Sequence, residues 1–148
     1  MGLPPIARRS YTGIRNMPPR RFTVEQAEQL LPRLTSVLTE IQELKHEHDR
    51  FQQKVAELGL KTKSNGHLLD GELKEAREGM ERTANMINEL APQIQDMDCE
   101  LKDIELGLID FRAERDGREV YLCWRLGEDR ISWWHELQTG YSGRQPLA

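Results

Sequence analysis

The chain has only two cysteines, Cys99 and Cys123, among its 148 residues. They are too few and too far apart in sequence for a disulfide framework or a CxxC metal site, so we expect two free thiols. No apolar run approaches the roughly 18 residues that a membrane-spanning helix needs, so we expect no such helix and no membrane partner. The first residues also lack the apolar segment of a secretory signal, and we therefore expect a cytoplasmic protein.

Acidic residues are missing from the first 22 positions, which hold five arginines: Arg8, Arg9, Arg15, Arg20 and Arg21. These arginines contribute +5, so the formal net charge of −4 leaves −9 for residues 23–148. A basic segment can contact nucleic acid or the ribosome, whereas its glycines and prolines are typical of a disordered leader. Because the rest of the chain is acidic, we expect residues 1–22 to be a disordered basic arm, and keep nucleic-acid or ribosome binding as the alternative.

Apolar residues recur at alternating steps of four and three in two long segments, which is the heptad pattern of packed helices. Thr23 and Gln26 have the spacing of a capping box, which marks the start of the first segment. A short turn signal around Asn65 and Gly66 separates the two segments, and helices joined in this way fold back on each other. We predict a long antiparallel two-helix coiled-coil hairpin over residues 23–107, with helices at about 24–58 and 69–106.

After Gly107 the apolar pattern becomes typical of strands. Short runs of β-forming residues occupy residues 108–111, 119–124 and 131–135, with a turn signal at Asp116–Gly117. We predict a short antiparallel β-meander and a C-terminal loop over residues 108–148, packed as one domain with the hairpin. The expected fold class is therefore mainly α with a small β unit (α+β).

The last two strands contain all three tryptophans, and we expect them to pair Leu122 with Trp133 and Val120 with His135. The indole rings either cap one end of the hairpin or line a ligand pocket. Gly140 and Gly143 would let backbone amides gather around an anion beside Arg144, whereas a plain C-terminal loop is the more common arrangement. The residues assigned to a ligand pocket or docking surface are Cys123, Trp124, Trp133, Trp134 and Arg144.

Titratable residues concentrate between Glu100 and Glu136. Carboxylates together with an imidazole suit a divalent ion such as iron, zinc or manganese. The segment contains neither HExxH nor HxH, so helix caps, ion pairs and solvent-exposed positions are the alternative explanation for these residues. The candidate metal ligands are Asp103, Asp110, Glu128 and His135.

Several short motifs together resemble a bacterial family catalogued as domain of unknown function 2203. They include residues 22–32, 101–111, 118–128 and 134–146, and the resemblance covers about residues 22–147. The resemblance implies no reaction, because the family has no established activity. Its shared elements fall here on the following residues: Asp103, Asp110, Cys123, Glu128 and His135. Where the family often has a proline after Asp-Phe, this chain has Arg112.

Two classes of function follow from these observations. The long heptads and the lack of a strict catalytic motif favour a non-catalytic protein-interaction module that acts as a homodimer or another homo-oligomer. The alternative is a metal-binding protein or a metal-dependent enzyme with an Asp/Glu/His site at the β end of the hairpin. The sequence identifies no catalytic residue.

Overall fold

The computed structural model describes residues 20–65 and 69–148 of the chain. Most of the predicted basic arm, including Arg8, Arg9 and Arg15, lies outside the described residues. The last two arginines of the arm are described, and both contact the chain itself. Arg20 lies over the ring of Phe22 at 4.4 Å, and Arg21 pairs with Glu114 at 3.2 Å.

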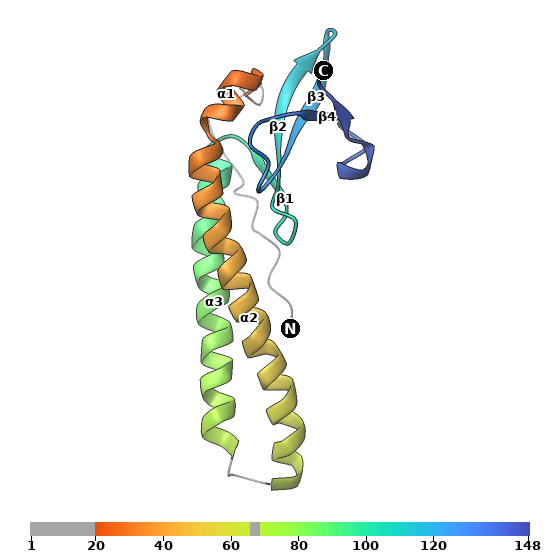
Figure 1. The fold of residues 1–148 in the computed structure, drawn as a ribbon. Helices are drawn as coiled ribbons and strands as arrows, with labels where there is room; N and C mark the ends of the chain where they lie inside the picture. The colour runs from red at the N-terminus through yellow and green to blue at the C-terminus, as the bar shows by residue number, and fades with distance from the viewer. Residues whose placement is uncertain (1–19, 66–68) are drawn as a thin grey trace, which may run out of the picture.

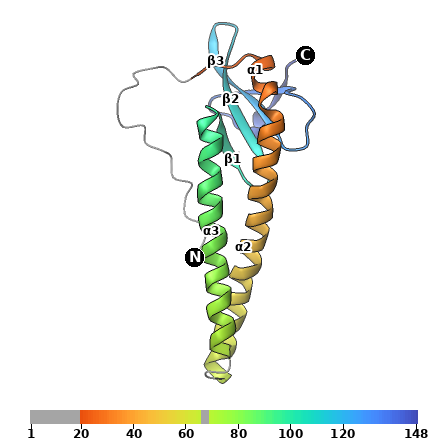
Figure 2. The same ribbon diagram turned by 90° about the vertical axis from the view of Figure 1, so that its left-hand side faces the viewer.

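Two long helices, α2 (Leu31–Asn65) and α3 (Asp70–Asp96), pack against each other along most of their length (Figure 1 and Figure 2). A short helix, α1 (Val24–Gln29), precedes them and begins with the predicted capping box. The hydroxyl of Thr23 accepts a hydrogen bond from the N–H of Gln26, whose side chain accepts one from the N–H of Thr23. The predicted helical hairpin is confirmed. In the part of the chain that the structure describes, no helix is long and apolar enough to cross a bilayer.

The first predicted helix, at about 24–58, begins where expected, at Val24, but differs from the structure in its interior and at its C-terminal end. It is interrupted at Leu30, because Pro32 cannot donate the backbone hydrogen bond that a continuous helix needs, and is accommodated in the first turn of α2 instead. It also continues past Gly59 to Asn65. A glycine inside a helix costs only about 1 kcal/mol relative to alanine, which is too little to end it.

The second predicted helix was wrong at its C-terminal end, since α3 ends at Asp96 rather than at about 106. Met97 caps the helix, and Asp98 follows with a left-handed φ of 63°, which turns the chain away from the helix axis. The next apolar residues of the heptad pattern, Leu101 and Ile104, pack on the same core from outside the helix. The apolar repeat therefore extends beyond the end of the helix, because Leu101 and Ile104 are packed on the core although they are not helical.

The second half of the chain forms a five-stranded antiparallel sheet in the order β1-β2-β3-β4-β5. A short 3₁₀ helix, η2 (Tyr141–Gly143), precedes the last strand. The turn between β2 and β3 has positive φ angles at Asp116 and Gly117, as its type of two-residue hairpin requires. This architecture confirms the predicted α+β class. The strands are β1 (Glu100–Asp103), β2 (Leu108–Arg115), β3 (Arg118–Arg125), β4 (Trp133–Glu136) and β5 (Gln145–Pro146).

The register between β3 and β4 is one residue away from the expected one. Tyr121 pairs with His135, and Leu122 pairs with Trp134. The connection is longer than a tight hairpin, because Ile131 is buried in the core ahead of β4 and its N–H meets Glu28 at 3.3 Å. A slip of one residue moves every side chain to the opposite face of a strand. His135 therefore lies on the face of the sheet that also carries Cys123.

One face of the sheet packs on the end of the hairpin where α1 and α2 meet (Figure 1). Alternate residues of β2 and β3 share a buried cluster with side chains of the helices, such as Leu34 and Ile94. The opposite face carries most of the polar side chains of the sheet. The two faces have different roles: the first holds the sheet to the helices, and the second holds the candidate site. The sheet residues of the core include Ile109, Phe111, Leu122, Trp124 and Trp134.

The close approach of α2 and α3 at Gly79 can be tested with a pair of glycine variants in α3. A Cβ atom at Gly79 would lie 2.5 Å from the ring of Phe51, whereas a Cβ at Gly71 would meet nothing within 4 Å. We expect Gly71→Ala to raise the free energy of unfolding by up to about 1 kcal/mol through helix propensity. Gly79→Ala should lower it by about 1–2 kcal/mol, because the ring must move. Urea unfolding measures both, and equal stabilisation by the two variants would contradict the packing at Gly79.

Candidate metal centre

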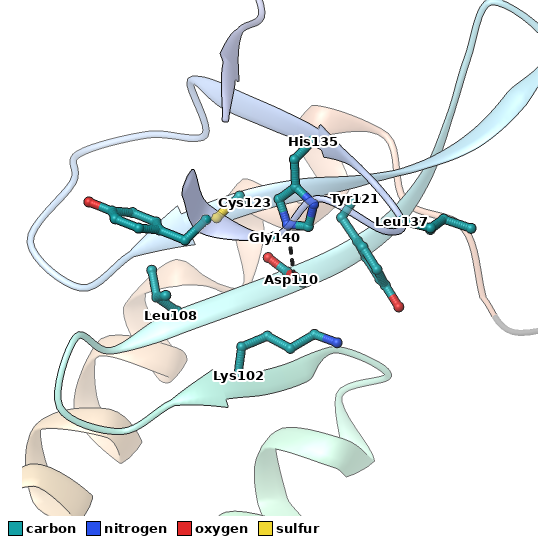
Figure 3. Close-up of a pocket in the computed structure, with 9 residues that line it drawn as sticks. Lys102, Leu108, Asp110, Tyr121, Cys123, His135, Leu137 and Gly140 are labelled. Atoms are coloured by element: carbon teal, nitrogen blue, oxygen red, sulfur yellow. Dashed lines mark hydrogen bonds and ion pairs between the residues drawn. The ribbon is translucent and has the colours of Figure 1, made fainter. Parts of the chain in front are cut away.

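Three neighbouring strands bring Asp110, Cys123 and His135 together on the polar face of the sheet. Asp110 of β2 pairs directly with Cys123 of β3, and His135 of β4 is the cross-strand partner of Tyr121. Cys123 and Tyr121 are two residues apart on one strand, so their side chains point to the same side. The three residues Asp110, Cys123 and His135 are 3%, 1% and 2% exposed. Figure 3 shows them converging on one point, with His135 directed toward Asp110.

His135 is held by hydrogen bonds at both ring nitrogens. Its Nδ1 lies 2.7 Å from the backbone oxygen of Glu136, and its Nε2 lies 3.0 Å from Oδ2 of Asp110. A carbonyl oxygen can only accept, so Nδ1 carries a hydrogen and donates it. This bond fixes the orientation of the ring and directs Nε2 toward Asp110 and the space beside it.

Asp110 is a buried carboxylate with one short hydrogen bond, to His135, and a weaker interaction with the thiol of Cys123. Its Oδ1 is fully buried and has no hydrogen-bond partner among the residues that the structure describes. Burial raises the pKa of Asp110 above its ordinary value, while the charge and hydrogen bond of His135 act in the opposite direction. An unpaired buried carboxylate oxygen is costly, and a cation beside it would remove this cost.

Cys123 contributes a sulfur atom to the same cluster. Its thiol pKa is raised to about 12, first by burial and then by the negative charge of Asp110. The thiol is therefore protonated at neutral pH, which excludes a role as a preformed thiolate nucleophile. One donor atom each from Asp110, Cys123 and His135 lie within 4.8 Å of one another, and together they form a group that could hold a metal ion.

A pocket of about 130 Å³ lies against this cluster. Its walls come from β1, β2, β3, β4 and the segment that follows β4, so residues far apart in the sequence share it. Lys102 lies on the β1 side of Asp110, and Leu137 lies beyond Tyr121 (Figure 3). Besides the three cluster residues, the pocket is lined by Lys102, Leu108, Tyr121, Leu137, Gly140 and Tyr141.

The structure brings together two of the four predicted metal ligands, Asp110 and His135. Asp103 instead accepts a hydrogen bond from the N–H of Leu106 at 2.9 Å, in the turn between β1 and β2. Glu128 is occupied by Arg144, with two contacts of 2.7 and 2.8 Å. Asp103 and Glu128 are therefore not part of the cluster, and Cys123 is its third member.

The residues assigned to a ligand pocket or docking surface do not form a single site. Trp124 is buried in the core, and its indole N–H donates to the backbone oxygen of Glu128. Trp134 is buried with it, under the guanidinium of Arg115 at 4.8 Å. Trp133 stacks instead on Arg144, also at 4.8 Å. Arg144, expected to meet an anion near Gly140 and Gly143, is neutralised by Glu128.

Two residues of the pocket, Lys102 and Tyr121, were missed as site residues by the sequence reasoning. Lys102 was placed on a helix, although its alternation with the half-buried Leu101 fits a strand. Tyr121 lies two residues before Cys123 on a recognised strand, which is the signal that could have identified it. The ammonium of Lys102 lies 4.8 Å from the centre of the Tyr121 ring and 3.2 Å from Glu100.

The fold and the site define an α+β protein in which a two-helix hairpin supports a sheet with a buried Asp–Cys–His cluster. A family model described as "Uncharacterized conserved protein (DUF2203)" matches residues 20–147, and the chain belongs to this family. The resemblance found in the sequence is thereby confirmed. No curated protein and no solved structure matches the chain. The family description names no activity, so the function is inferred from the site of this chain.

Both cysteines should be unreactive while the protein is folded. Cys99 and Cys123 are buried, and burial raises the pKa of each thiol to about 12. With a pKa of about 12, the ionised fraction of each thiol at pH 8 is at least about a thousandfold smaller than that of a free cysteine. We expect iodoacetamide to label neither residue in the native protein and both in urea, as read by mass spectrometry of peptides. Rapid native labelling of Cys123 would contradict the buried cluster.

Proposed function

We propose that this chain is a metal-binding protein that holds one divalent ion between Asp110, Cys123 and His135. The buried Oδ1 of Asp110, which has no hydrogen-bond partner among the described residues, carries this proposal. Asp110 belongs to a group of three residues that offer one oxygen, one sulfur and one nitrogen atom, all within 4.8 Å of one another. A carboxylate, an imidazole and a thiolate are the ligand types that zinc accepts.

Zinc matches this set of ligands better than manganese does. Manganese prefers oxygen ligands, and a cysteine in the group therefore disfavours it. Zinc–nitrogen and zinc–oxygen bonds of about 2.0–2.1 Å place two ligands of a tetrahedral ion about 3.3 Å apart. The distance of 3.0 Å between Nε2 of His135 and Oδ2 of Asp110 is close to that value.

The hydrogen bond at Nδ1 of His135 also supports a ligand role for this residue. A histidine that binds a metal through one nitrogen usually donates the hydrogen of the other to a backbone oxygen or a carboxylate. His135 has this arrangement through the backbone oxygen of Glu136 at 2.7 Å. The ring is oriented before an ion arrives, so little ordering is needed on binding.

Three protein ligands leave one position of a tetrahedral ion open, as in catalytic zinc sites. The pocket of about 130 Å³ beside the cluster gives this position room for water or a small molecule. Water on such an ion becomes acidic enough to attack a substrate near neutral pH. The proposal therefore extends to a metal-dependent hydrolase as the class of enzyme.

An interaction module that forms homo-oligomers is the second candidate. Between residues 49 and 61, Leu58 alone is buried, and Leu60 is exposed on the same stretch of α2. A hairpin that buries so few residues along this stretch would bury more apolar surface by pairing with a second copy. Light scattering tests this candidate, for which a dimer is the expected result and a stable monomer the contrary one.

The first test of the proposal is the metal content of protein purified without a tag and without chelator. We expect close to one equivalent of zinc in the natural protein. Cys123→Ser and His135→Ala each remove one ligand and should weaken zinc binding more than about a hundredfold, because loss of a supporting residue alone costs 10- to 100-fold. Inductively coupled plasma mass spectrometry and a chelator competition give both quantities.

Matched variants keep this test specific. Cys99 is the other buried cysteine and donates to the backbone oxygen of Ile94, away from the cluster. Asp103 lies in the turn between β1 and β2. Cys99→Ser and Asp103→Asn should keep the metal, whereas Asp110→Asn should lose it. If all variants that fold by circular dichroism bind zinc equally, or none does, the proposed site is wrong.

Zinc binding should become stronger as the pH rises. The thiol pKa of Cys123 is about 12 in the absence of metal, so the sulfur is protonated throughout the range from pH 6.5 to 8.5. Binding as a thiolate then releases at least one proton, and the apparent affinity should rise at least about tenfold per pH unit. Chelator competition at several pH values measures this slope, and an affinity independent of pH would exclude the thiolate as a ligand.

A further inference from the structure

The pocket beside the cluster has the size of a small organic molecule. Its volume is about 130 Å³. An engineered protein cavity of about 150 Å³ holds benzene, so this pocket has room for about six non-hydrogen atoms. Asp110, Cys123 and His135 form one of its walls, and a ligand inside it would therefore touch the open side of an ion held by them.

Part of the pocket wall is apolar. Leu108 comes from the start of β2, and Leu137 and Tyr141 come from the segment after β4. Leu137 is 42% exposed and Tyr141 is 37% exposed, which makes them two of the four exposed large hydrophobic residues among the described ones. Apolar side chains that are exposed around a pocket mark a surface that gains free energy when a ligand covers it.

The pocket wall also carries a positive charge. Lys102 lines the pocket, and its charge favours the ionised form of Asp110. An ion with two positive charges would neutralise the carboxylate of Asp110 and the thiolate of Cys123. Lys102 would then favour an anion in the pocket, while Glu100, 3.2 Å from its ammonium, disfavours a second negative charge.

We propose that this pocket binds a small monocarboxylate with an apolar body of about three carbon atoms. This inference rests on the proposed metal site. One carboxylate oxygen occupies the open position of the ion, and the other faces Lys102. The hydrocarbon chain lies against Leu108, Leu137 and Tyr141. A dianion, an amine and a neutral amide each lack part of this complementarity.

The test uses the full chain loaded with cobalt, because the visible spectrum of cobalt(II) reports on its ligands. Cobalt content is measured first, and acetate, propionate, butyrate and pentanoate are then titrated at constant ionic strength. We expect the affinity to rise about fourfold for each methylene up to butyrate, which has six non-hydrogen atoms, and to level off at pentanoate. Butylamine and butyramide should leave the spectrum unchanged.

Variants separate the charge from the apolar wall. Lys102→Met should weaken butyrate binding about three- to fivefold, the size of a partly exposed ion pair, and Lys102→Arg should restore most of it. Lys45→Met is the matched control, since Lys45 pairs with Asp49 and Glu105 and does not line this pocket. Leu137→Ala should reduce the gain per methylene and leave acetate unaffected.

The outcomes distinguish the two proposals. Stoichiometric cobalt whose spectrum responds to no carboxylate, or responds equally to acetate and butyrate, overturns the carboxylate pocket and leaves the metal site standing. Protein that folds but takes up no cobalt overturns both. A Lys45→Met effect as large as that of Lys102→Met would show that overall charge, rather than Lys102, attracts the anion.

Discussion

The Nε2 atom of His135 lies 3.0 Å from Oδ2 of Asp110, and both residues are almost completely buried in the sheet. A carboxylate in such a place needs a compensating charge or several hydrogen bonds, and here one of its oxygens has no partner among the described residues. The imidazole supplies part of the compensation, and its other nitrogen is fixed by the backbone of Glu136. The thiol of Cys123 completes a group that could hold a metal ion. This contact depends on the register of three strands and on a rigid support behind them.

The support comes from the opposite face of the sheet. Phe111 and Trp124 alternate along β2 and β3 with Asp110 and Cys123, and they are buried in the core shared with the helices. Each strand therefore has one side fixed by packing and one side available for chemistry. Because the same strands form both faces, a shift that moved the site would also expose the core. The helical hairpin thus contributes to the site indirectly, by holding the sheet in one register.

Much of the fold follows from local patterns in the sequence. The heptads predicted two long contacting helices, the Thr23–Gln26 spacing predicted the capping box, and Asp116–Gly117 predicted the first β-turn. The end of α3 was missed because Leu101 and Ile104 continue the apolar repeat although they pack from outside the helix. A periodic pattern shows which residues are buried but not which element buries them.

The structure brings together two of the four residues predicted as metal ligands and keeps the other two apart, for physical reasons. Asp110 and His135 are brought together by tertiary structure, whereas Asp103 and Glu128 are engaged in local contacts with Leu106 and Arg144. Cys123 joins the first pair only in the observed register, because the expected pairing of β3 and β4 turned His135 to the other face. Ile131, ahead of β4, is buried and contacts Glu28, which is 103 residues away, and no local sequence pattern contains this contact.

The most direct test of the central claim is X-ray absorption spectroscopy at the zinc edge on protein purified without chelator. The account predicts one sulfur ligand at about 2.3 Å together with nitrogen and oxygen ligands at about 2.0–2.1 Å, since Cys123 is the single thiol of the cluster. A first shell of nitrogen and oxygen alone, or one with two sulfur atoms, would contradict a site made of Asp110, Cys123 and His135.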